Sequence, residues 1–274
     1  MELKRSKKFS MFIDSQRAGA VKSRSEERLH SMPEKKMGTF YGIGVGPGDP
    51  GLLTVRAVEI LREAKVVFAA SSPKNDYSMA LNIAREHLNG EVDIRFLNFP
   101  MVRDPGELEQ AWSENARRVL GTLESGRDAV FVTIGDPLTY STYGYLMRTI
   151  LEMAPDTPIE TIPGITAYQA AASRLNVPLM EAEEALVVVS GVAGSEEVKR
   201  IAKCAENLVI MKAYRNFDEI VDALESLPES RDIYVVSHCG LDNEMVCRDA
   251  RQLRGEKMPY MSLLIAKRTE SKTD

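Results

Sequence analysis

The sequence contains no apolar run long enough to cross a membrane. Its longest runs, such as residues 66–70 and 186–189, fall far short of the roughly 18 residues that a membrane-spanning helix needs. Because 44% of the residues are hydrophobic and 27% are charged, the composition is that of an ordinary globular protein. We therefore expect a soluble protein with a substantial core, built as one large domain or two of moderate size.

Cysteine is also scarce, with only Cys204, Cys239 and Cys247 present. Three scattered cysteines cannot build a disulfide framework, and none of them stands in the Cys-x-x-Cys spacing of a zinc site. A reducing compartment fits this usage best, so we expect a cytoplasmic protein without a bound structural metal.

Net positive charge is found only at one end of the chain. Residues 1–36 hold ten Lys and Arg against five Asp and Glu, and the remaining residues hold 25 against 35. Such an acidic body repels polyanions, so we expect no nucleic-acid partner. The basic segment 1–36 has no apolar periodicity, and we expect it to be a disordered extension outside the fold.

From residue 39 onward, short apolar runs alternate with amphipathic stretches, which is typical of α/β proteins. The pattern restarts after residue 178, which places a domain boundary between residues 163 and 184, and we expect an N-terminal α/β domain over residues 37–163 and a C-terminal one over residues 164–274. The sheets should be largely parallel or mixed. Strands are predicted at residues 40–45, 65–70, 94–97, 129–134 and 159–162, and then at 186–190, 208–211, 233–237 and 262–266.

A glycine-rich turn, residues 42–51, follows the first predicted strand. Glycines between a strand and a helix suggest a dinucleotide-binding turn, but Pro47 and Pro50 remove two backbone N–H donors and stiffen the loop. No Lys-Ser or Lys-Thr pair follows, which excludes a P-loop. The wall of a binding cleft is the better interpretation, and a tight turn without a ligand is the alternative.

A second turn, residues 133–142, follows the buried strand 129–134. Ligands of parallel sheets bind beyond the carboxyl ends of the strands, so this position favours a function. Gly135 permits close backbone approach, and Pro137 restricts the turn. Asp136 could accept hydrogen bonds from a ligand, or it could cap the following helix.

Together with residues 162–167 (Ile-Pro-Gly-Ile-Thr-Ala), the two turns resemble the signatures of the tetrapyrrole methylase family, and the likeness extends from residue 38 to about 267. The resemblance implies two α/β domains with a cleft between them for S-adenosyl-L-methionine. It also implies a tetrapyrrole substrate and a homodimer. The longer run 135–146 is most similar to enzymes that methylate C-20 of precorrin-2 or of its cobalt-bearing counterpart.

The resemblance also implies which residues contact the cofactor. A segment at residues 236–241 departs from the family pattern, in which many members have a small residue followed by Gly-Thr. Residues 259–261 are a weaker candidate. The expected cofactor-binding residues are Pro47, Gly135, Asp136, Leu138, Thr166, Ala167, Met211 and Gly240.

Methyl transfer to carbon depends on orientation and on exclusion of water, so we expect no catalytic triad and no covalent enzyme intermediate. Candidates for a base that removes the C-20 proton are Asp136, Tyr140, Tyr143 and His238, and the sequence does not rank them. Substrate carboxylates would need cations, for which Lys74, Arg103 and Arg215 are candidates. Alternative functions are methylation of uroporphyrinogen, of a diphthamide precursor or of ribosomal RNA, and a non-catalytic nucleotide-binding module.

Overall fold

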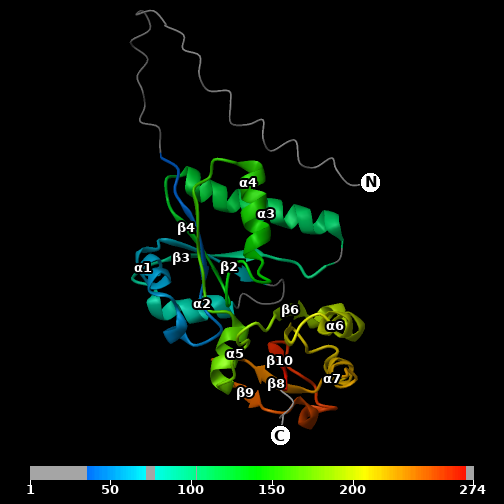
Figure 1. Cartoon of the computed structure of the whole chain (residues 1–274). Coiled ribbons are helices and arrows are strands. Elements are labelled where there is room, and N and C mark those ends of the chain that lie inside the picture. Colours follow the sequence, from blue (N-terminus) through cyan, green and yellow to red (C-terminus); the bar gives the residue numbers. More distant parts are fainter. Residues whose placement is uncertain (1–35, 72–77, 103, 270–274) are drawn as a thin grey trace, which may run out of the picture. The chain divides into compact units, whose positions relative to one another are not determined.

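The computed structural model describes residues 36–71, 78–102 and 104–269. The extension expected at residues 1–36 lies outside this range except for Lys36, as do the candidate cations Lys74 and Arg103. Two five-stranded sheets follow one another along the chain (Figure 1). None of the helices in the described part is long and apolar enough to cross a membrane.

The first sheet is parallel throughout, in the order β3-β2-β4-β1-β5. Its central strand β4 is apolar and buried along almost its whole length, as expected for a strand that is covered on both faces. The strands of this sheet are β1 (Phe40–Gly44), β2 (Val66–Ser71), β3 (Asp93–Asn98), β4 (Ala129–Thr133) and β5 (Ile159–Ile162).

Helices cover both faces of the first sheet (Figure 1). One face packs against α1 and α2, and the other packs against α3 and α4. The start of α1 shows how the sequence sets these helices, because the Thr54 hydroxyl accepts a hydrogen bond from the N–H of Ala57 at 3.2 Å. The helices are α1 (Val55–Glu63), α2 (Met79–Ala84), α3 (Pro105–Glu124) and α4 (Tyr143–Met153).

The second sheet is mixed, in the order β6-β7-β10-β8-β9. β6 and β7 are parallel, and the other neighbours are antiparallel. α5 packs on one face, and α6 and α7 pack on the other. The strands are β6 (Leu186–Ser190), β7 (Asn207–Met211), β8 (Arg231–Ser237), β9 (Met245–Cys247) and β10 (Ser262–Arg268), and the helices are α5 (Ala167–Leu175), α6 (Ser195–Ala202) and α7 (Phe217–Glu225).

The predicted fold class is confirmed, and each predicted strand corresponds to an observed one. Two differences have simple causes. β9 has only three residues at a sheet edge, too few to produce a periodic pattern. The apolar spacing of Trp112, Val119 and Leu120 predicts a helix over residues 111–123. α3 begins earlier, at Pro105, because the carboxylate of Asp104 accepts from the N–H of Glu107 at 2.8 Å and proline is favourable at the first helical position.

Candidate functional site

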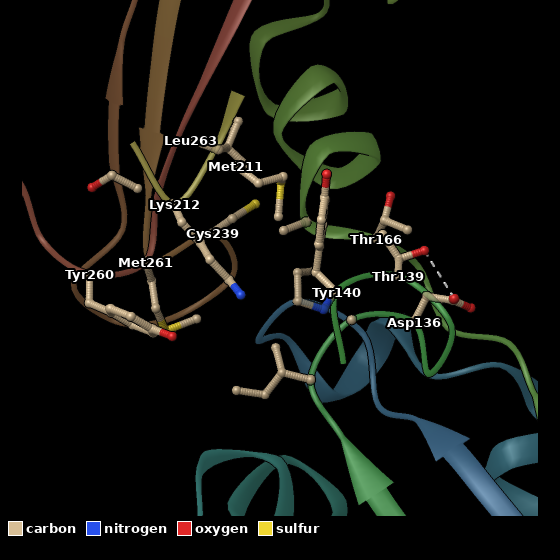
Figure 2. Close-up of a pocket in the computed structure, with 15 residues that line it drawn as sticks. Asp136, Thr139, Tyr140, Thr166, Met211, Lys212, Cys239, Tyr260, Met261 and Leu263 are labelled. Carbon is tan, nitrogen blue, oxygen red and sulfur yellow. Dashed lines mark hydrogen bonds between the residues drawn. The ribbon is translucent and has the colours of Figure 1, made fainter. Parts of the chain in front are cut away.

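A cavity of about 210 Å³ lies where loops at the carboxyl ends of β1 and β4 meet the second sheet and the start of α5 (Figure 2). The first two loops contribute Pro47, Ile134, Gly135, Asp136, Thr139 and Tyr140. The start of α5 and the end of β7 contribute Thr166, Ala167, Met211 and Lys212. The remaining lining comes from Cys239, Tyr260, Met261, Ser262 and Leu263.

The loops after β1 and β4 are joined to each other by backbone hydrogen bonds. The N–H of Gly135 donates to the carbonyl of Gly46 at 2.7 Å, and the N–H of Gly46 donates to the carbonyl of Gly135 at 3.3 Å. Both residues have positive φ angles, 75° for Gly46 and 68° for Gly135, which glycine adopts at little cost. The two glycine turns therefore form one unit.

Three glycines from three separate motifs also lie in direct contact. A Cβ atom on Gly44 would lie 2.5 Å from the carbonyl oxygen of Gly135 and 2.7 Å from the nitrogen of Gly164. A Cβ atom on Gly164 would lie 2.1 Å from the same carbonyl oxygen. These distances leave no room for a side chain on Gly44 or Gly164, so the end of β1 and the loop after β5 can approach the backbone of Gly135 only as glycines.

The carboxylate of Asp136 connects two of these loops. One oxygen accepts hydrogen bonds from the N–H of Leu138 at 2.9 Å and from the hydroxyl of Thr139 at 3.2 Å. The other oxygen accepts from the N–H of Gly164 at 3.2 Å. Helix α4 is not capped by Asp136, because the N–H of Tyr143 donates to the hydroxyl of Ser141 at 3.1 Å. Asp136 thus shapes the turn and links it to the loop after β5.

Two lining residues, Tyr140 and Lys212, hold the left-handed backbone conformation, with φ angles of 51° and 58°. Few residues other than glycine, asparagine and aspartate adopt it, and such strain persists only where the surrounding structure imposes it. The two side chains approach each other from opposite sides of the cavity (Figure 2), and the Lys212 ammonium lies 5.7 Å from the centroid of the Tyr140 ring. This geometry is a cation–π contact.

Aromatic residues continue beyond Lys212 along the second sheet. The rings of Tyr214 and Tyr260 meet edge to face at 5.1 Å, and the guanidinium of Arg215 lies 5.4 Å from the Tyr214 ring centroid. Tyr260 is 57% exposed. Of these three residues only Tyr260 lines the cavity, and Tyr214 and the candidate cation Arg215 contact one another behind it.

The wall beside Tyr260 is held by two buried serines. The hydroxyls of Ser237 and Ser262 share a hydrogen bond of 2.7 Å, and that of Ser262 donates to the carbonyl of Pro259 at 2.7 Å. Ser262 thereby connects the end of β8 to the segment that carries Tyr260 and Met261. Burial, together with the smaller effect of the nearby Glu244 carboxylate, raises the pKa of the neighbouring Cys239 thiol to about 11. Cys239 is therefore an uncharged apolar lining group at neutral pH.

Comparison with known proteins agrees with this geometry. A sequence model of the family described as "Tetrapyrrole (Corrin/Porphyrin) Methylases" matches residues 39–252. The cobalt-precorrin-2 C(20)-methyltransferase of Salmonella typhimurium is 31% identical over 83% of this chain and 95% of that protein. The chain belongs to the tetrapyrrole methylases.

Two further relatives of this methylase are informative. A precorrin-2 C(20)-methyltransferase from a Sinorhizobium species is 30% identical over 84% of this chain and 95% of that protein. The crystal structure of uroporphyrin-III C-methyl transferase from Thermus thermophilus, complexed with S-adenosylhomocysteine, superposes with a TM-score of 0.58. That likeness covers 84% of this chain and 97% of the other at 21% identity, which shows a shared fold.

The structure of this methylase brings most of the sequence-predicted site residues together. Leu138 is 63% exposed and does not line the cavity. Gly240, at φ 77°, does not line the cavity either; its backbone packs against the first loop, where an added Cβ atom would lie 2.7 Å from the nitrogen of Asp49, and its contact with the cofactor stays a prediction. The residues that line the cavity as expected are Pro47, Gly135, Asp136, Thr166, Ala167 and Met211.

The four candidate bases occupy different environments. Tyr140 and Asp136 line the cavity, and His238 and Tyr143 do not. The Tyr143 side chain is fully buried, its hydroxyl lies 2.6 Å from the hydroxyl of Thr161, and burial raises its pKa above the ordinary value for tyrosine. Tyr143 is therefore placed as a core residue, and an added Cβ on Gly42 would overlap its ring.

Sequence reasoning missed Lys212, Thr139 and Leu263 as lining residues. Lys212 follows directly after the predicted strand that ends at Met211. Its position just beyond the carboxyl end of a strand is a signal that could have identified Lys212 as a lining residue. No local motif marks its left-handed backbone. Thr139 belongs to the second turn, in which the Gly-Asp-Pro motif is the stronger sequence signal.

Proposed function

We propose that this chain is an S-adenosylmethionine-dependent methyltransferase that methylates C-20 of precorrin-2 or of its cobalt-bearing counterpart. The observation that carries the proposal is the convergence of the three family loops on one cavity that the end of β7 closes from the other side. The choice of C-20 is supported by the relatives whose names specify that position.

The residues around the cavity fit the methyl donor. Met211, Leu263 and Ala167 offer apolar surface suited to an adenine ring, and Gly135 adds no side chain at the mouth of the β4 turn. When bound, the cofactor supplies a methyl carbon made electrophilic by its sulfonium. We propose that its contacts are the lining residues Pro47, Gly135, Asp136, Thr166, Ala167 and Met211.

The chain's own residues contribute orientation and exclusion of water. Asp136 fixes the β4 turn to the loop after β5, and the Gly46–Gly135 bonds fix it to the loop after β1. A site whose three loops are joined to one another positions its contents with little reorganisation, which is the main requirement for transfer between a sulfonium and an already nucleophilic carbon. Tyr140, half-exposed at the cavity edge, is the lining group best placed to accept or relay a proton.

Titration with S-adenosylhomocysteine and mass spectrometry of reaction products test this function. We expect calorimetry to detect binding of S-adenosylhomocysteine. We also expect a gain of one methyl group on precorrin-2, on cobalt-factor II or on both, and isotope labelling to locate that methyl group at C-20. Binding without turnover on either compound would favour a non-catalytic module, and absence of binding would refute the methyltransferase proposal. Parallel reactions with the two compounds decide whether the substrate carries cobalt.

The organisation of the molecule is part of the same proposal. We propose an N-terminal domain over residues 37–163 and a C-terminal domain over residues 164–274, because the first sheet ends with β5 and α5 already packs on the second sheet. We also propose a cytoplasmic location, because of the cysteine usage, and a homodimer, as the family resemblance implies. Light scattering during size-exclusion chromatography tests the dimer, and a mass equal to a single chain would contradict it.

A further inference from the structure

Lys212 is unusual among the residues around the cavity. Only Asp136 and Lys212 among the lining residues carry a formal charge. The Asp136 carboxylate already accepts three hydrogen bonds from its own turn and from Gly164, so its oxygens are committed. Within the part of the chain that the structure describes, Lys212 makes no ion pair with any carboxylate.

The contact that Lys212 does make is a weak one. Its ammonium lies 5.7 Å from the centre of the Tyr140 ring, and Tyr140 is itself 50% exposed. A ring quadrupole attracts a cation less strongly than the full charge of a carboxylate does. The ammonium can therefore leave the ring for a carboxylate at little cost.

The backbone supplies a second, independent observation. Lys212 and Tyr140 both hold left-handed conformations, at φ 58° and 51°. Strain of this kind at non-glycine residues is concentrated at ligand-binding positions, where the surrounding structure maintains it. The conformations direct both side chains into the same cavity (Figure 2).

We propose that Lys212 is a carboxylate-binding residue of this site and that Tyr140 holds its ammonium in place until the carboxylate arrives. The inference rests on the proposed function, which supplies two sources of a carboxylate. One is the amino-acid end of the cofactor, and the other is an acidic side chain on the rim of the tetrapyrrole. A lysine ammonium is a compact cation suited to either.

Two variants and one control test the role of Lys212. Lys212→Met removes the charge and keeps a long apolar side chain, and Lys212→Arg keeps the charge. Lys203→Met makes the same change at an exposed lysine directly after α6, which does not line the cavity. Thermal unfolding monitored by circular dichroism verifies that each variant is folded.

The cofactor arm compares S-adenosylhomocysteine with 5′-methylthioadenosine, which lacks the amino-acid group. If the cofactor's carboxylate binds Lys212, Lys212→Met raises the Kd of S-adenosylhomocysteine about tenfold, as expected for loss of a charged hydrogen bond, and leaves that of 5′-methylthioadenosine unchanged. The substrate arm measures binding of uroporphyrin I, a polycarboxylate porphyrin, by fluorescence quenching. If the tetrapyrrole carboxylate binds Lys212, the Kd of uroporphyrin I rises about tenfold instead.

In either case Lys212→Arg recovers binding to within about threefold of wild type, and Lys203→Met matches wild type. The proposal is overturned if Lys212→Met binds as wild type does in both arms, and this includes the case in which neither protein binds uroporphyrin I. It is also overturned if Lys212→Met weakens the binding of 5′-methylthioadenosine as much as the binding of S-adenosylhomocysteine. Both arms measure binding alone. A failure to methylate both precorrin-2 and cobalt-factor II would therefore refute the proposed function and leave the result on Lys212 separate.

Discussion

Replacing Gly44 with alanine tests whether close backbone contact between the three loops builds the cofactor cavity. Gly44 ends β1, and its φ angle is not in the left-handed region, so the substitution adds a methyl group without backbone strain. That methyl carbon would lie 2.5 Å from the carbonyl oxygen of Gly135 and 2.7 Å and 2.8 Å from two atoms of Gly164. All three neighbours are backbone atoms and cannot rotate away.

The magnitude follows from these distances. Ordinary contact begins near 3.4 Å, so the loop that carries Gly135 must move by about 0.9 Å. Overpacking of this kind costs ~1–3 kcal/mol in unfolding free energy. A shift of this size also exceeds the ~0.5 Å to which a binding site must be held, so we expect the affinity for S-adenosylhomocysteine to fall at least about tenfold.

Gly121→Ala is the matched control, because Gly121 lies in α3 and an added Cβ would meet nothing within 4 Å. Alanine is the better helix former, so this variant should gain ~0.5–1 kcal/mol and bind cofactor as wild type does. Urea unfolding gives the stabilities, and isothermal titration gives the affinities. If Gly44→Ala lies within ~0.5 kcal/mol of wild type and binds S-adenosylhomocysteine normally, the three-glycine contact does not form the cavity.

Three more substitutions probe single side chains. Asp136→Ala should weaken S-adenosylhomocysteine about tenfold while the circular dichroism spectrum stays native, because its loop loses the tether to Gly164; unchanged affinity with a lower Tm would confine Asp136 to shaping the turn. Tyr143→Phe should lose ~1 kcal/mol of stability with kcat unchanged, since it removes only the hydroxyl contact with Thr161; a large fall in kcat would make Tyr143 the base after all. The Cys239 thiol, whose pKa burial raises to about 11, stays protonated in the folded protein at pH values where it ionises in the unfolded chain. Its contribution to stability is therefore fully present below the pKa of an unfolded cysteine and is lost as pH rises toward 11. From pH 8 to 10.5, wild type should therefore lose up to ~2 kcal/mol more than Cys239→Ala in urea unfolding, and equal losses would contradict the raised pKa.

The fold was predictable because periodicity is a local property of the sequence. The buried run 129–134 and the helical spacing of residues 167–175 each specify an element without reference to the rest of the chain. The position of the site followed from the same elements, because the loops after parallel strands meet at one edge of a sheet. β9 lacked a signal because a three-residue edge strand is set by its pairing with β8.

The detailed site was less predictable because it depends on contacts between distant residues. The family resemblance implies a cofactor contact at Gly240, and the structure adds that the backbone of Gly240 packs against Asp49, about 190 residues earlier in the chain. Similarly, the contact between Lys212 and Tyr140 requires left-handed backbone at two residues that seldom adopt it. Neither feature leaves a pattern in the neighbouring sequence.

The glycines of the signature loops therefore have a different physical role from the one their sequence first suggests. Gly135 could have been expected to open its backbone to a ligand, but its N–H donates to Gly46 and its carbonyl oxygen lies against Gly44 and Gly164. The motifs thus specify how three loops pack, and the chemically distinctive groups, Tyr140 and Lys212, line the cavity that these loops border. Since the packed loops can be shared by methylases of different specificity, we expect substitutions at Tyr140 and Lys212 to change which ligand is bound, and substitutions at the glycines to change whether any ligand is bound.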